Sequence, residues 1–189
     1  MKVMDYLKGL PKEGPQFIVI HLEGSHDRYR DRVPPHFEGV HVEGQPEKVN
    51  DYDSSIKYTD EVLKNIYQYA KDNMNLQAMV YFGDHGEDMV RFHGDGYFTW
   101  AMIRSPAFVY LSKDYVDGHP LIADNLRRNV GDVFTNDLLF DAVCGIMGAE
   151  NNVYNAIYDM TAAKYGLTWD KAVSKYGNIR IQEDPAIQK

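Results

Sequence analysis

The sequence has a single cysteine, no long apolar run and no block of basic residues. Cys144 cannot form an internal disulfide, and its place in the apolar run 138–147 predicts a buried structural thiol. No segment approaches the roughly 18 apolar residues of a membrane span, so we expect this stretch of chain to be soluble. Acidic residues outnumber basic ones by 28 to 20, which argues against nucleic acid as a partner.

What the sequence does contain is enough apolar material for a core. Hydrophobic residues make up 44% of the 189 residues, a share typical of a globular protein. Residues 1–16 are interrupted by glycine and proline and form a lead-in, and the polar residues 177–189 form a tail. We therefore expect a single domain over residues 1–189.

Three short apolar runs have the character of buried strands: Phe17–Leu22, Ala78–Phe82 and Ala107–Leu111. Between the first two, apolar residues recur at helical spacing from Asp53 to Asp72, and Asp53 or Ser54 can cap that helix. Strand, helix and strand in this order favour a right-handed parallel crossover. The pattern predicts an α/β fold with a mostly parallel central sheet flanked by helices.

The remaining pattern is weaker. Residues 33–49 are rich in proline and glycine and predict an extended surface loop. Thr135 or Asn136 can cap a helix that Gly148 ends, and a short helix is expected from Thr168 to Tyr176.

Asp84 and His85 follow the strand 78–82, at the position where open α/β sheets keep their ligands. Adjacent strand residues point to opposite faces, so the two can share a ligand only if the chain turns between them. A carboxylate beside an imidazole suits zinc or a similar divalent ion. His93 can fold back as a further ligand or as a proton donor. Taken alone, the pair is also typical of a turn cap beside a half-buried histidine.

A second junction follows the first predicted strand and carries His26. This histidine can be a metal ligand, can hold an anionic substrate oxygen, or can be an ordinary loop residue. A parallel crossover would bring both junctions to one edge of the sheet, so we expect His26, Asp84, His85 and His93 to converge on one pocket.

Four motifs carry a family resemblance, and their order along the chain is part of it. They are His21-Leu22-Glu23-Gly24-Ser25-His26, the segment Tyr52 to Asp60, Gly83-Asp84-His85-Gly86-Glu87, and Phe92-His93-Gly94. With weaker pieces as far as Tyr158, this order resembles the lipid A phosphoethanolamine transferases. That family belongs to the sulfatase-like branch of the alkaline phosphatase superfamily.

The resemblance implies roles for four residues. Asp84 and His85 match ligands of the catalytic zinc, or of another divalent metal in its place. His26 and His93 match catalytic residues that line the phosphoryl site and could hold a second zinc. The implied reaction takes phosphoethanolamine from a phospholipid onto a threonine and then onto a lipid or glycan such as lipopolysaccharide. The implied parent is anchored in the inner membrane, with this domain in the periplasm.

The chain also departs from the family. Asp27 stands where glycine is usual, Asn136 replaces a common histidine, and residues 1–16 match no segment bearing the threonine nucleophile or a glutamate zinc ligand. We therefore expect the C-terminal part of a sulfatase-like catalytic domain, inactive alone, with an exposed edge or face that invites the missing N-terminal half or self-association. A related phosphate or sulfate ester hydrolase and a non-catalytic sulfatase-like binding domain are the alternatives.

Overall fold

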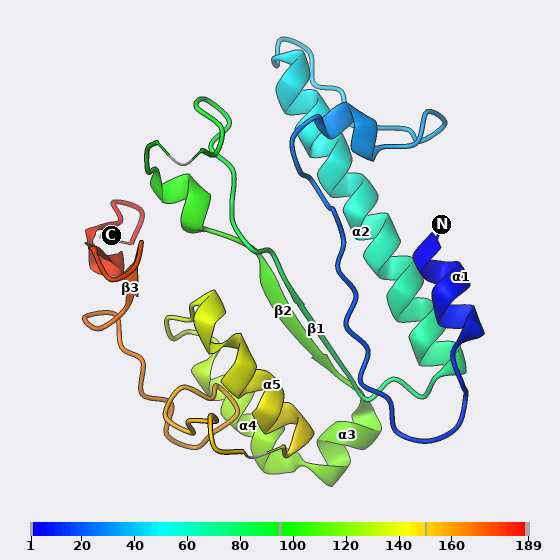
Figure 1. Ribbon diagram of the computed structural model, residues 1–189, viewed down its shortest axis with the longest axis vertical. Helices are drawn as coiled ribbons and strands as arrows, with labels where there is room; N and C mark the ends of the chain where they lie inside the picture. The colour runs from blue at the N-terminus through cyan, green and yellow to red at the C-terminus, as the bar shows by residue number, and fades with distance from the viewer. Residues whose placement is uncertain (1, 95, 150, 188–189) are drawn as a thin grey trace. The chain divides into compact units, whose positions relative to one another are not determined.

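The computed structural model describes residues 2–94, 96–149 and 151–187. The chain forms two compact units, residues 1–76 and residues 77–189 (Figure 1). The single domain over residues 1–189 stays a prediction. In the part of the chain described, no helix combines the length and apolar character needed to span a bilayer.

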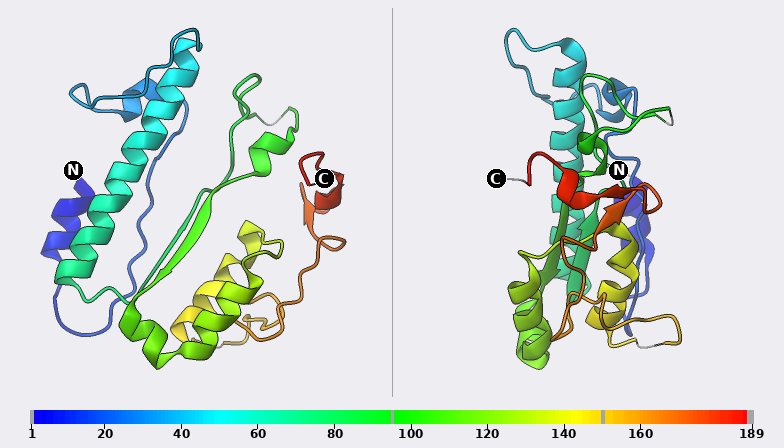
Figure 2. Two further views of the ribbon diagram at one scale, coloured as in Figure 1. Left: turned by 180° about the vertical axis from the view of Figure 1, so that it is seen from behind. Right: turned by 90° about the vertical axis from the view of Figure 1, so that its left-hand side faces the viewer.

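The first unit is built on one long helix. Helix α2 covers Glu47–Asn73, and helix α1, Lys2–Gly9, packs along it (Figure 2). The buried side chains of α2 include Val62, Leu63 and Ile66, which lie on the apolar side that the periodicity predicts. The predicted helix is therefore confirmed, although its start is not.

Helix α2 begins at Glu47, within the predicted loop 33–49, because Pro46 ends the extended stretch and an acidic residue follows in the first turn. Ser54 is inside the helix and does not cap it. Its Oγ accepts a hydrogen bond from the Val40 N–H at 2.8 Å, and Asn50 Oδ1 accepts one from the Val42 N–H at 3.0 Å. The loop is thus held against the helix by buried polar side chains.

The predicted strand Phe17–Leu22 is absent from the structure. The segment is extended but pairs with no strand among the described residues, and Phe17 and Val19 are 64% and 77% exposed. A strand is completed by a neighbour that accepts and donates its backbone hydrogen bonds, and local sequence cannot supply that neighbour.

In the second unit, strands β1 (Ala78–Phe82) and β2 (Ala107–Leu111) form where the sequence predicts them. They pair antiparallel, with Ala78 opposite Leu111 and Phe82 opposite Ala107, so the predicted parallel arrangement is not found in this pair. Parallel neighbours need a long crossover, usually a helix. The described part of the connection holds only the short 3-10 helix η2, Trp100–Ile103.

A run of short helices follows β2 in the chain and precedes a small hairpin (Figure 1). The helices are α3 (Lys113–Gly118), α4 (Pro120–Asn129), the 3-10 helix η3 (Asn136–Leu138) and α5 (Leu139–Met147). The predicted helix is confirmed at its end, with Gly148 in the left-handed conformation at φ 62°. Its predicted cap is wrong, because α5 begins at Leu139 after η3 and neither Thr135 nor Asn136 caps it. Ala142, Cys144 and Ile146 of α5 are buried, which confirms the structural placement of the thiol.

The predicted helix Thr168–Tyr176 is wrong. Strands β3 (Val173–Ser174) and β4 (Ile179–Arg180) form a small antiparallel hairpin there, followed by the 3-10 helix η4, Ile181–Glu183. Lys175, Tyr176 and Gly177 have φ of 49°, 57° and 83°, so the chain reverses at the point where the helix was expected to end.

Candidate functional site

The loop after β1 carries the predicted metal ligands and is fixed by the chain beside it. The Gly83 N–H donates to the Pro106 carbonyl at 2.9 Å, and the Gly86 N–H donates to the Met102 carbonyl at 2.7 Å. A Cβ on Gly86 would lie 2.1 Å from the Ala101 carbonyl oxygen, so this close approach requires glycine.

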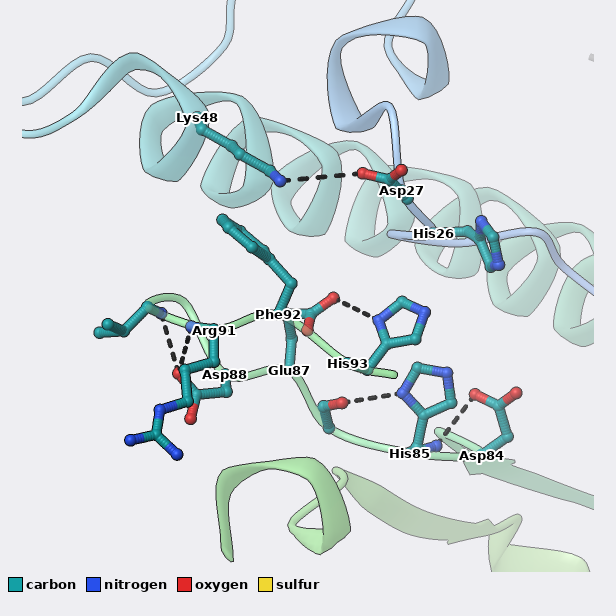
Figure 3. Close-up of polar contacts among 12 residues, drawn as sticks. His26, Asp27, Lys48, Asp84, His85, Glu87, Asp88, Arg91, Phe92 and His93 are labelled. Carbon is teal, nitrogen blue, oxygen red and sulfur yellow. Dashed lines mark hydrogen bonds and ion pairs between the residues drawn. The ribbon is translucent and has the colours of Figure 1, made fainter. Parts of the chain in front are cut away.

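Asp84 and His85 are both exposed, and the backbone bends at Asp84. Asp84 Oδ1 accepts from the His85 N–H at 3.0 Å, and His85 Nδ1 lies 2.8 Å from the Gly86 carbonyl oxygen (Figure 3). A carbonyl oxygen only accepts, so Nδ1 is the donor and Nε2 carries the lone pair. His85 therefore presents Nε2 for coordination, as a histidine ligand held by its other ring nitrogen does.

His93 folds back onto the same loop through a residue that sequence reasoning did not select. Its Nδ1 lies 2.7 Å from Glu87 Oε2, and the Glu87 side chain is only 5% exposed. The rings of His85 and His93 have centroids 4.6 Å apart. The signal that could have revealed Glu87 is its place directly after Asp-His-Gly, six residues before a histidine.

Asp88 builds the turn that returns the chain to His93. Its Oδ1 accepts from the N–H groups of Val90 and Arg91 at 2.8 and 3.0 Å, and the Phe92 N–H donates to the Asp88 carbonyl at 2.6 Å. The hydrogen bonds from Arg91 and Val90 hold the pKa of Asp88 below its ordinary value. The turn is therefore strongest with Asp88 ionised.

His26 belongs to the first unit and lies on an exposed loop. Arg32 supports that loop: its Nη2 donates to the Asp27 carbonyl at 3.0 Å, and its Nη1 lies 2.6 Å from Glu23 Oε1. Arg28 adopts a left-handed conformation at φ 60° where the loop enters the 3-10 helix η1, Tyr29–Arg32. The convergence of His26 with Asp84, His85 and His93 stays a prediction.

The donor chemistry of Asp84 and His85 fits a zinc ion, since one offers a carboxylate oxygen and the other a free Nε2. Within residues 2–94, 96–149 and 151–187, no three His, Cys, Asp or Glu side chains gather as a metal-binding group. Two ligands are fewer than the three or four protein ligands of a zinc site. A complete site would thus need further ligands to approach this pair.

Comparisons with known proteins agree with the motif resemblance. Phosphoethanolamine transferase EptA of Escherichia coli K12 is 26% identical over 175 residues, covering 82% of this chain and 32% of that protein. A putative phosphoethanolamine transferase of Haemophilus influenzae is 38% identical over 81 residues, 39% of this chain and 17% of that protein. The chain spans about a third or less of the length of these relatives.

The fold is compared with a solved structure, the C-terminal periplasmic domain of phosphoethanolamine transferase EptC from Campylobacter jejuni. The TM-score is 0.64 at 22% identity, over 86% of this chain and 56% of that chain. This likeness confirms the predicted sulfatase-like α/β class, although the described strands pair antiparallel. The family model described as Sulfatase matches residues 1–149. Because that match covers most of the sequence, the chain belongs to the sulfatase family.

Proposed function

We propose that this chain supplies the metal-binding and phosphoryl-binding loops of a zinc-dependent phosphoethanolamine transferase. The observation that carries the proposal is the pair Asp84 and His85, with the Nδ1 of His85 held by the Gly86 carbonyl and Nε2 left to coordinate. The relatives named above are phosphoethanolamine transferases, which supports the choice of reaction within the sulfatase family.

Four residues take part in the proposed chemistry. Asp84 and His85 would hold the zinc, or another divalent ion, which supplies Lewis-acid stabilisation of charge on phosphoryl oxygens. His26 and His93 would face the phosphoryl group or hold a second ion. Glu87 holds the proton of His93 on Nδ1, so Nε2 is the atom that takes a proton from an acceptor hydroxyl or contacts a phosphoryl oxygen.

The nucleophile of this proposal is a threonine on a further segment of polypeptide. Two threonine hydroxyls of the described chain already have structural partners: Thr59 Oγ1 donates to the Ser55 carbonyl at 2.9 Å, and Thr161 Oγ1 donates to Asp159 Oδ2 at 2.8 Å. The exposed apolar side chains of Phe17 and Val19 favour a further strand docking there. Self-association of the chain would cover the same surface.

The proposed donor is a phosphoethanolamine-bearing phospholipid, and the proposed acceptor is a lipid or glycan hydroxyl. A relative from Salmonella typhimurium, 28% identical over 85 residues, is a Kdo(2)-lipid A phosphoethanolamine 7''-transferase, which supports an acceptor of the lipopolysaccharide type. Both substrates are membrane lipids or lie at a membrane surface. The proposal therefore includes a parent protein anchored in the inner membrane, with this part in the periplasm.

The test combines zinc binding with transfer. Calorimetric titration of the chain with zinc should give a saturable heat that Asp84→Ala or His85→Ala removes, and His41→Ala, an exposed histidine on another loop, should leave unchanged. Transfer of phosphoethanolamine from phosphatidylethanolamine to lipid A, followed by mass spectrometry, should be at most trace with the chain alone. Adding a threonine-bearing segment should restore transfer. Strong turnover by residues 1–189 alone would show that the nucleophile is in this chain.

A non-catalytic sulfatase-like binding domain is the second candidate. It is favoured by the observation that the described residues gather no group of three metal-binding side chains. On that proposal the loops bind a phosphate or sulfate ester without turnover. Failure of the restored protein to transfer, together with retained binding of inorganic phosphate, would favour this candidate over the transferase.

A further inference from the structure

We propose that Asn136 is a positioning residue that holds the bend at which Asp84 and His85 turn to a common ligand. Its Nδ2 donates to the carbonyl oxygens of both Gly83 and Asp84, at 2.9 and 3.0 Å. These contacts join residues 53 and 52 positions apart in the chain. The importance of this contact for catalysis rests on the proposed function, whereas the contact itself does not.

The two hydrogen bonds identify a turn in the backbone. Along a regular strand successive carbonyl groups and successive side chains point to opposite sides. One amide nitrogen can reach the carbonyls of both Gly83 and Asp84 only where the chain has left that geometry, and the backbone bends at Asp84. In Figure 3 the side chains of Asp84 and His85 rise from the same side of the chain. Asn136 therefore holds the conformation that a shared ligand requires.

Asparagine suits this place because its amide nitrogen has two protons and the two carbonyls only accept. Aspartate has nearly the same shape but would set carboxylate oxygens against the carbonyl oxygens. Alanine would leave both carbonyls to water. Asn136→Asp changes the shape of the side chain less than Asn136→Ala, but it should disturb the bend more. Loss of packing alone would give the opposite order.

The structure also explains why Asn136 can resist movement of the loop. It begins the 3-10 helix η3, and Leu138 at the end of η3 is 6% exposed. Helix α5 follows directly, with Ala142 also buried. The amide is thus attached to the core of the second unit, while the loop it holds is exposed. Backbone contacts hold the other side of the loop, through the N–H groups of Gly83 and Gly86.

Amide hydrogen exchange of the full chain, resolved by residue, tests the contact without any metal. The N–H groups of Gly83 and Gly86 should exchange about tenfold faster in Asn136→Ala, since two hydrogen bonds are lost, and faster still in Asn136→Asp. Asn178→Asp is the matched control, because Asn178 Nδ2 also donates to a backbone carbonyl, that of Lys175 at 2.9 Å. It should leave both amides unchanged.

Zinc titration supplies the functional readout. Asn136→Ala should weaken zinc binding by about tenfold, because the ligands must be ordered on binding, while the melting temperature stays close to that of Asn178→Asp. Asn136→Asp is not used for this measurement, since its added charge would attract the ion. If the unaltered chain binds no zinc, the zinc-binding part of the proposed function fails for this chain alone, and the exchange experiment still decides the role of Asn136. Wild-type exchange at Gly83 and Gly86 in both variants, or faster exchange spread evenly over the chain, would overturn the proposal.

Discussion

Replacing Glu87 by glutamine should change the protonation pattern of the His93 ring while leaving the loop folded. Glu87 Oε2 lies 2.7 Å from His93 Nδ1, and the carboxylate is 5% exposed. A carboxylate only accepts, so it keeps the proton of neutral His93 on Nδ1. The amide of glutamine has the same size but can accept through oxygen or donate through nitrogen. The preference of His93 for the Nδ1–H tautomer should therefore fall.

The size of the effect follows from the two kinds of hydrogen bond. A bond to a charged group contributes about 1.5–3 kcal/mol, and a neutral one about 0.5–1.5 kcal/mol. The His93 side chain is 31% exposed, so water competes and the lower end of the difference applies. A loss of about 1 kcal/mol corresponds to a change of roughly fivefold in the tautomer ratio.

Nuclear magnetic resonance measures this ratio directly, through the 15N shifts of the imidazole nitrogens. The spectra should be recorded at about pH 8, above the ordinary pKa of histidine. Glu61→Gln is the matched control, because Glu61 pairs with Lys64 at 3.5 Å on the exposed side of α2. The reasoning is refuted if His93 keeps its wild-type tautomer ratio in Glu87→Gln, or if Glu61→Gln shifts it equally.

Two further predictions concern stability, both measured by urea unfolding. Arg104 Nε donates to Asp184 Oδ2 at 2.8 Å and lowers the pKa of that buried carboxyl. The pair therefore stabilises the folded protein fully above about pH 4, and this stabilisation is lost as the pH falls through the lowered pKa. Asp184→Asn should therefore lower the free energy of unfolding by about 1.5 kcal/mol at neutral pH, and it should make that free energy less sensitive to acid. Equal acid sensitivity in the variant and the wild type would contradict this. Gly86→Ala should cost about 1–3 kcal/mol, because its Cβ would meet the carbonyl oxygens of Ala101 and Arg104 at 2.1 and 2.2 Å. Gly131→Ala, with nothing within 4 Å, is the control, and equal midpoints for the two variants would refute the steric argument.

The parts of the site that sequence could predict are those set by neighbours in the chain. Gly83 follows the strand 78–82, and Asp84 and His85 come next at the bend, as local patterning indicates. Glu87 escaped notice because its partner is reached through a turn that Asp88 closes. Asn136 was visible as a possible helix cap and as a departure from a family pattern, but not as a partner of the loop, since its contacts lie more than 50 residues away. The periodicity of apolar residues in a sequence does not reveal such contacts between distant side chains.

The segment Phe17–Leu22 shows where local and long-range information separate. Its burial alternates residue by residue, with Ile18, Ile20 and Leu22 half-buried and Phe17, Val19 and His21 exposed. That period of two is the one a strand imposes, so the sequence does select an extended backbone. The described chain provides no partner strand for this segment. Backbone hydrogen bonds between strands need a second segment at the right register. The proposed further strand would dock on the exposed apolar side chains of this extended segment. Burial of those side chains by the strand would complete the sheet that the apolar run predicts.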